Sequence, residues 1–197
     1  MAETILVTGI HREELGFGDR VAALLDTGRI HIMRIPQGIS HTRTGTGGDL
    51  FYYNTRHREI YLQLRQQMKG RYRLLIDLHC GLNEAGRCAD VYCRDETLLQ
   101  CVSKRVAQAG MKERIRMVKI LGDSESSDAV AGSRDVETSA RTLIPEQIWK
   151  DTSFSYVGLE IYLAEEGVGI DEDWRFARGL IETIRICGMI RERRETV

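Results

Sequence analysis

The sequence has no apolar run long enough to cross a membrane, and its N-terminus lacks the basic start and long apolar core of a signal peptide. It also has no excess of charge, because 28 Lys and Arg residues face 29 Asp and Glu residues, for a formal net charge of −1. Such a chain has no bulk electrostatic attraction for nucleic acid or for an anionic membrane surface. We therefore expect a cytoplasmic protein that binds neither nucleic acid nor membranes, and the sequence leaves its oligomeric state open.

Cysteine pairs with the spacing of a metal or redox motif are also missing. The 5 cysteines are an odd number and include no Cys-x-x-Cys pair. A chain of 197 residues can bury a hydrophobic core of its own, so it does not depend on a disulfide framework. The sequence therefore predicts reduced thiols and one domain that spans residues 1–197.

What the sequence does contain is a series of short apolar segments that alternate with segments of helical periodicity. The segments expected to be strands are 4–8, 29–35, 72–78, 90–93, 116–121 and 154–163. The segments expected to be helices are 15–25, 60–68, 96–109 and 174–184. This alternation predicts a three-layer α/β fold, in which helices flank a mostly parallel mixed sheet. Two polar stretches, 37–49 and 122–139, are expected to be loops.

His11, Glu14 and His79 are the candidate metal ligands. His11 and Glu14 follow the strand at 4–8 and are three residues apart, so at the start of a helix their side chains face the same way. His79 ends the strand at 72–78, and in open α/β sheets ligands bind beyond the carboxyl ends of the strands. Zinc hydrolases often use three such ligands and leave a fourth position for water. Each residue alone also has a structural explanation, as a surface histidine, a helix N-terminal acid or a hydrogen-bonded core histidine.

Glu160 is a candidate general base because it interrupts the apolar segment 157–163. A carboxylate within an apolar strand is rarely buried without a partner, so Glu160 is either ion-paired or functional. Beside a metal-activated water it can take a proton and later donate it to a leaving amine. Asp77 lies two residues before His79 on the same strand face, where it can orient a ligand imidazole or bond to a neighbouring loop.

The Gly-x-His-x-x-Glu motif at 9–14, the Asp-Leu-His at 77–79 and the strand residue Glu160 resemble the succinylglutamate desuccinylase/aspartoacylase family. That family belongs with the zinc carboxypeptidase-like hydrolases. The resemblance extends over roughly residues 4–165 through sparse motifs, and it implies the zinc carboxypeptidase-like fold. It further implies a zinc-dependent hydrolase that cleaves an N-acyl amino acid or a peptide-like small amide. By this match the three metal candidates hold zinc and Glu160 activates water.

The resemblance also implies side chains that hold the substrate. The family has an Asn-Arg pair that binds the substrate carboxylate, and its nearest match is Asn54-Thr55-Arg56, with one residue inserted. A guanidinium binds a carboxylate through two parallel hydrogen bonds, so Arg56 is chemically suitable, and a solvated helix start is the alternative. Arg43 is a counterpart by loop position of the arginine that polarises the scissile carbonyl, and Arg134 lies in a loop able to close the pocket. We expect the β-rich C-terminal domain of larger family members to be missing, which leaves the substrate open.

Other functions fit parts of the sequence. The Gly-rich run 44–49 lacks the Gly-Lys-Ser/Thr of a phosphate-binding loop and does not join a strand to a helix. Cys80 suggests a cysteine amidase, but neighbours on a strand point to opposite faces, so His79 is poorly placed as its base. A non-catalytic protein of the same fold that binds a metal or another ligand, or a carboxypeptidase acting on peptides, remains an alternative.

Overall fold

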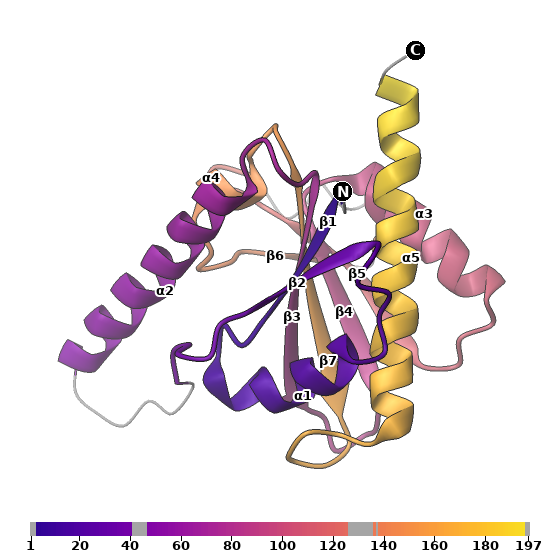
Figure 1. Cartoon of the computed structure of the whole chain (residues 1–197), viewed down its shortest axis with the longest axis horizontal. Coiled ribbons are helices and arrows are strands. Elements are labelled where there is room, and N and C mark those ends of the chain that lie inside the picture. Colours follow the sequence, from indigo (N-terminus) through magenta and orange to yellow (C-terminus); the bar gives the residue numbers. More distant parts are fainter. Residues whose placement is uncertain (1–2, 41–46, 126–135, 137, 196–197) are drawn as a thin grey trace.

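A 7-stranded mixed sheet forms the centre of the molecule (Figure 1). The computed structural model describes residues 3–40, 47–125, 136 and 138–195. The strands are β1 (Thr4–Thr8), β2 (Ile30–Arg34), β3 (Leu74–Leu82), β4 (Cys88–Cys93), β5 (Arg114–Ile120), β6 (Thr138–Ala140) and β7 (Ser155–Leu163). The helices are the 3₁₀ turn η1 (Arg12–Glu14), α1 (Leu15–Ala22), α2 (Gly47–Met68), α3 (Glu96–Gln108), α4 (Glu146–Trp149) and α5 (Asp171–Glu195).

The sheet consists of two groups of parallel strands, and the two groups run in opposite directions. Its order is β2-β1-β3-β7-β4-β5-β6. The strands β2, β1, β3 and β7 are parallel, β4 runs antiparallel to β7, and β4, β5 and β6 are again parallel. The mostly parallel mixed sheet predicted from the sequence is therefore confirmed. The carboxyl ends of the first group lie together at one edge of the sheet.

Helices cover both faces of the sheet and complete three layers (Figure 1). On one face α1, α3 and α5 pack onto the strands, where Phe17 and Leu180 belong to the same core cluster as Ile76 of β3. On the other face α2 and α4 cover part of the sheet, and Leu64 of α2 belongs to a second cluster with Leu75 of β3. Because alternate residues of a strand face opposite sides, β3 contributes to both clusters.

Most of the expected elements are present. The differences include two short elements that were not predicted and two elements that are longer than predicted. The strand β6 and the helix α4 were not predicted, because elements of 3 and 4 residues are too short to show a period. The helix α2 begins at Gly47, within a stretch that was expected to be a loop. The strand β3 continues past His79 to Leu82. Most of the predicted loop at 122–139 lies outside the described residues.

A disulfide joins two helices and corrects the expectation of reduced thiols. Cys101 of α3 is bonded to Cys187 of α5, with their Cα atoms 5.8 Å apart. The two residues are separated by 86 positions, so no local spacing motif could have indicated the pair. Cys80, Cys88 and Cys93 are free thiols. The disulfide links the helices that cover the face opposite α2.

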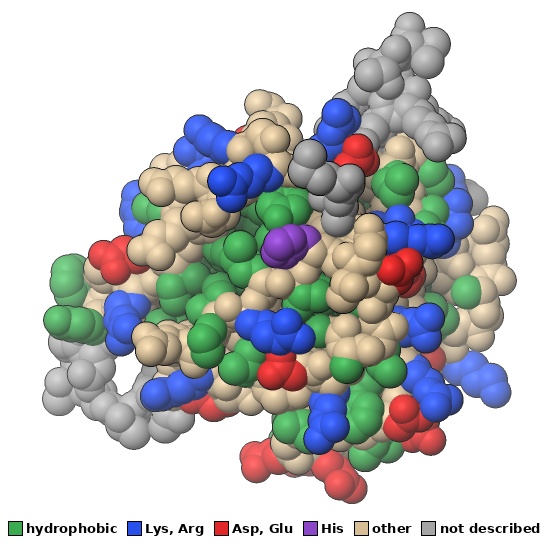
Figure 2. Space-filling model, in the orientation of Figure 1, with side chains coloured by type: hydrophobic (Ala, Val, Ile, Leu, Met, Phe, Trp, Pro, Cys, Tyr) green, Lys and Arg blue, Asp and Glu red, His purple; other side chains and the backbone are tan. Residues whose placement is uncertain are grey.

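The surface carries both signs of charge. On the face shown in Figure 2, Lys and Arg side chains lie among Asp and Glu side chains, and a histidine lies next to hydrophobic side chains. Within the described ranges, no helix combines the length and apolar character needed to span a membrane.

Candidate metal centre

A tight turn after β1 leads the chain from the sheet into the site. Gly9 has φ of +80°, a left-handed conformation that favours glycine, and a Cβ there would lie 2.8 Å from the carbonyl oxygen of Ile35. The turn η1 begins three residues later. His11 and Glu14 are therefore held directly beyond the carboxyl end of β1.

The side chains of β3 and β7 complete the site from the sheet. Asp77 and His79 lie on the same face of β3 as Leu75, which packs on the side of α2. His79 is in register with Glu160 on the neighbouring parallel strand β7. Residues in register on adjacent strands point to the same side, so His79 and Glu160 are lateral neighbours.

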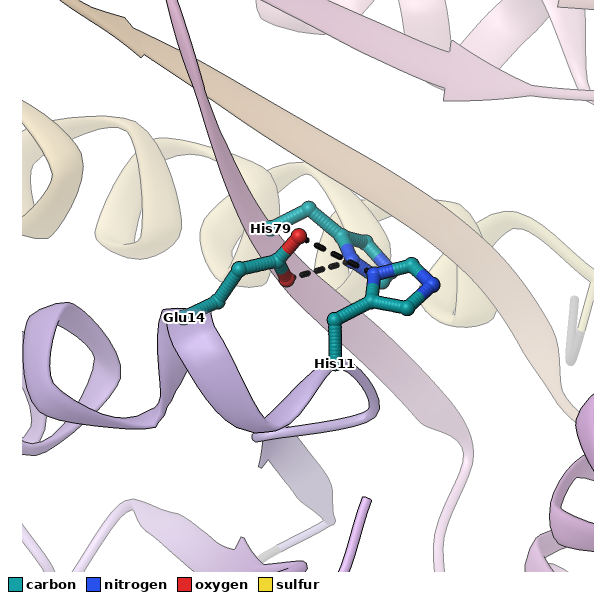
Figure 3. A group of neighbouring side chains, drawn as sticks. All are labelled: His11, Glu14 and His79. Carbon is teal, nitrogen blue, oxygen red and sulfur yellow. Dashed lines mark hydrogen bonds and ion pairs between the residues drawn. The ribbon is translucent and has the colours of Figure 1, made fainter. Parts of the chain in front are cut away.

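Glu14 lies between two histidines and contacts both of them (Figure 3). Its Oε1 lies 3.0 Å from Nδ1 of His11, and its Oε2 lies 2.8 Å from Nδ1 of His79. One ligand atom from each of the three side chains lies within 4.8 Å of the other two. The exposed fractions are 7% for His11, 4% for Glu14 and 9% for His79, so the group is shielded from bulk water. The structure thus brings together the three predicted metal ligands as a group that can hold a metal ion.

The outer nitrogen of each histidine also has a partner. Nε2 of His11 lies 3.2 Å from the hydroxyl oxygen of Tyr53, and Nε2 of His79 lies 3.1 Å from Oδ2 of Asp77. Both rings consequently present Nδ1 to the interior of the group. Metal-binding histidines commonly bond through their second nitrogen to a carboxylate or another acceptor, which fixes the tautomer and the ring orientation.

The buried carboxylates of Asp77 and Glu14 favour a positive charge on or beside His79. Burial alone would lower the pKa of His79, but Asp77 and Glu14 outweigh it and hold that pKa well above its usual value. Burial alone would raise the pKa of Asp77, but the charge of His79 and the hydrogen bonds of His79, Tyr61 and Tyr156 lower it. Imidazole binds a metal in its neutral form, so a bound cation replaces the proton of His79. The donor set therefore fits a divalent metal ion.

A cavity of about 360 Å³ opens beside the candidate ligands, large enough for part of a small molecule. His11, His79 and Glu160 line it from the sheet side. The other lining residues are Tyr53, His57, Tyr61, Tyr92, Ile120, Ala140, Arg141, Thr142, Leu143, Ile144, Tyr156, Gly158 and Leu159. Arg141 is the only Lys or Arg among the described residues that line the cavity.

Two predicted substrate-binding residues, Asn54 and Arg56, lie away from this cavity. Asn54 and Arg56 are exposed on α2 and do not belong to the cavity lining. Arg43 and Arg134 lie outside the described residues. On α2 the inward positions are instead Tyr53, His57 and Tyr61, whose spacing of four residues was a usable signal that the sequence interpretation missed.

A second buried carboxylate lies on the other side of Glu160. Asp90 of β4 is in register with Glu160 and is 1% exposed. Arg116 donates to both oxygens of Asp90, from Nε to Oδ1 at 2.6 Å and from Nη2 to Oδ2. The hydroxyls of Tyr92 and Tyr162 lie 3.1 and 3.3 Å from Oδ2. Asp90 is thus satisfied by groups outside the metal centre.

Cys80 is poorly placed to act as a nucleophile. It follows His79 on β3 and packs against the core cluster on the opposite face of the sheet. Burial raises the pKa of its thiol to about 12, and the nearby carboxylates of Glu14 and Glu160 add to the effect. The reactive thiolate is therefore scarce at neutral pH, which disfavours the cysteine amidase alternative.

Solved structures share this architecture. A mutant form of murine aminoacylase 3 is 13% identical over 96% of this chain and 64% of that chain, with a TM-score of 0.53. The chain has the fold of aminoacylase 3. Unmutated murine aminoacylase 3 gives 12% identity over 96% and 65% of the two chains, with a TM-score of 0.50. The zinc carboxypeptidase-like fold implied by the motifs is thereby confirmed.

The similarity to aminoacylase 3 is one of structure rather than sequence. No protein-family model and no curated protein matches the chain. A succinylglutamate desuccinylase from Chromobacterium violaceum is 12% identical over 93% of this chain and 60% of its own, with a TM-score of 0.48. The chain spans 64% of the length of the aminoacylase 3 structure.

Proposed function

We propose that the protein is a zinc-dependent hydrolase that cleaves the amide bond of an N-acyl amino acid or a similar small amide carrying a carboxylate. The observation that carries this proposal is the convergence of His11, Glu14 and His79 at the wall of a cavity that Glu160 also lines. The shared fold supports it, since aminoacylase 3 is by its name an enzyme of the same reaction class.

Zinc suits this donor set of two imidazoles and one carboxylate. His11 and His79 would hold it through their Nδ1 atoms, and Glu14 would hold it through a carboxylate oxygen. Three protein ligands leave one position open, as in catalytic zinc sites. When bound there, zinc lowers the pKa of water and polarises the scissile carbonyl.

Glu160 moves the protons of the reaction. Its carboxylate takes a proton from the attacking water as the water oxygen bonds to the carbonyl carbon. The same group then donates that proton to the amide nitrogen as the carbon–nitrogen bond breaks, so the products are a carboxylic acid and an amine. The position of Glu160 on the cavity wall, in register with His79, supports this role.

Arg141 is our candidate for binding the substrate carboxylate. It lines the cavity, and its Nη2 donates to the backbone carbonyls of Asp123 and Glu125 at a long 3.4 Å in each case, so part of the guanidinium fork can bind another acceptor. The roles predicted for Asn54 and Arg56 stay predictions, and the same holds for Arg43 and Arg134.

The decisive experiment combines metal analysis with one conservative substitution. Protein purified without added metal is expected to contain about one zinc per chain. Glu160→Gln is expected to keep the zinc and to lower turnover of N-acyl amino acids by about 10²- to 10⁴-fold, because the general base is removed. Glu165→Gln, in the exposed loop after β7, is the matched control and should leave turnover unchanged.

Each alternative predicts a different result. Protein without metal, or protein whose zinc content survives both His11→Ala and His79→Ala, contradicts the metal centre. Zinc binding without turnover of any amide favours a non-catalytic protein. A strong preference for peptides with free C-termini favours a carboxypeptidase.

A further inference from the structure

One side of α2 directs a row of aromatic side chains at the metal centre. Tyr53, His57 and Tyr61 are spaced four residues apart, which places them on one helix face, and all three line the cavity. The row does more than fill space, because Tyr53 contacts the candidate ligand His11 and Tyr61 contacts Asp77, the partner of His79.

Tyr53 contacts His11 directly. The distance from its hydroxyl oxygen to Nε2 of His11 is 3.2 Å. Because Nδ1 of His11 faces Glu14, a metal in that place leaves the ring hydrogen on Nε2, where it donates to the Tyr53 hydroxyl. Tyr53 thus favours the tautomer of His11 that presents a lone pair to the metal.

Tyr61 acts on His79 through Asp77. Its hydroxyl donates to Oδ2 of Asp77 at 2.5 Å, and Tyr156 donates to the same oxygen at 3.0 Å. That oxygen also lies 3.1 Å from Nε2 of His79. Tyr61 is fully buried and Asp77 is 1% exposed, so this carboxylate is held by protein groups rather than by solvent.

His57 packs between the two tyrosines and keeps the row in place. Its ring centroid lies 5.9 Å from that of Tyr53, in a stacked arrangement, and 4.9 Å from that of Tyr61. It also stacks on His11 at 6.2 Å between ring centroids. His57 is 7% exposed, so the row is a packed layer over the ligands.

We propose that α2 positions the metal centre, with Tyr53 and Tyr61 fixing the ring orientation of His11 and His79. The ligands come from the loop after β1 and from β3, and α2 contacts both histidine sites. Tyr53 contacts His11 directly, and Tyr61 reaches His79 through Asp77 of β3. This role rests on the metal centre proposed above and adds two positioning residues to it.

The test compares three substitutions that each remove one hydroxyl from α2. Tyr53→Phe and Tyr61→Phe remove the proposed contacts, and Tyr52→Phe removes a neighbouring hydroxyl from a side chain that is 70% exposed. Zinc affinity is measured by competition with a chromogenic chelator, and the visible absorption of the cobalt-substituted protein reports the ligand geometry. Tyr53→Phe and Tyr61→Phe are each expected to lower zinc affinity by about 10-fold or more, the size of effect typical for partners of metal ligands. Both should alter the cobalt spectrum, whereas Tyr52→Phe should leave affinity and spectrum unchanged.

The result separates this proposal from the one on which it rests. If wild-type protein binds zinc and Tyr53→Phe and Tyr61→Phe bind it as tightly as Tyr52→Phe does, the positioning role is rejected while the metal centre stands. If wild-type protein binds no zinc, both are rejected. If Tyr61→Phe fails to fold by circular dichroism, Tyr53→Phe decides the matter, because Tyr53 is only partly buried.

Discussion

Asp77 and Asp90 are two buried aspartates on the same face of the sheet, with similar partners and different consequences. Both are 1% exposed, and both accept hydrogen bonds from two tyrosine hydroxyls. Asp90 is paired with an arginine that stays charged at any physiological pH, whereas Asp77 is paired with His79. The arginine neutralises Asp90 permanently, but the histidine turns its second nitrogen to Glu14 and can exchange its proton for a metal ion. The identity of the basic partner therefore distinguishes a structural ion pair from a binding site.

Removing His79 should have the largest effect and should affect only the Asp77 region. His79→Ala is expected to abolish zinc binding, because one of three protein ligands is lost. Metal content per chain after dialysis measures this. The protein should remain folded, because Asp77 keeps its two tyrosine donors. Full zinc content in the variant would show that His79 is not a ligand.

Breaking the Asp90 pair should lower stability without affecting the metal. Asp90→Asn leaves Arg116 without its counter-charge, and the free energy of unfolding should fall by about 2–3 kcal/mol. This is below the range for a fully buried pair, since the Arg116 side chain is 38% exposed and can be hydrated. Denaturant titration measures the loss. A zinc affinity that falls together with stability would mean that the two regions are coupled.

The matching change at Asp77 should give the opposite pattern. Asp77→Asn is expected to weaken zinc binding by about 10- to 100-fold, because the acceptor that orients His79 loses its charge. Chelator competition measures the affinity, and Asp90→Asn serves as the control. Equal zinc affinity in the two variants would remove the distinction between the aspartates.

The pH dependence of the metal-free protein should give the smallest difference. The folded pKa of His79 is raised, so its pairing contributes stability that is fully present below the unfolded pKa of about 6.5 and is lost as pH rises through the folded value. With a chelator present, the free energy of unfolding should fall as pH increases above about 6.5. Denaturant titrations at a series of pH values, with His79→Gln as the control, measure this slope. The same slope in the variant would assign it to other groups.

Local sequence patterns predicted the parts of the site that follow strands. His11, Glu14 and His79 could be placed because strand ends are visible in a sequence and the carboxyl ends of parallel strands meet at one edge. Which α2 residues face the cavity depends instead on the rotation of that helix about its axis, which no short motif shows. The sequence predicted an amphipathic helix over 60–68, and in the structure Tyr61, Leu64 and Met68 of that helix are buried.

Extending the spacing of Tyr61 backwards by one and two helical turns would have pointed to His57 and Tyr53 as further residues on the cavity side of α2. The partners of Asp90 could not be found in this way. They come from different strands, and their pairing depends on the register of β4 with β5 and β7. The strand β6 and the helix α4 were too short to leave a periodic signal.

The disulfide between α3 and α5 has a practical consequence for experiments on this protein. It lies on the face of the sheet that α1, α3 and α5 cover, whereas His11 and His79 line the cavity that the α2 residues Tyr53, His57 and Tyr61 also line. A reductant therefore acts on one side of the sheet and a chelator on the other. If the proposed metal is bound, a reductant that does not itself bind metal should loosen the α3–α5 layer, while a chelator removes the metal from the other face.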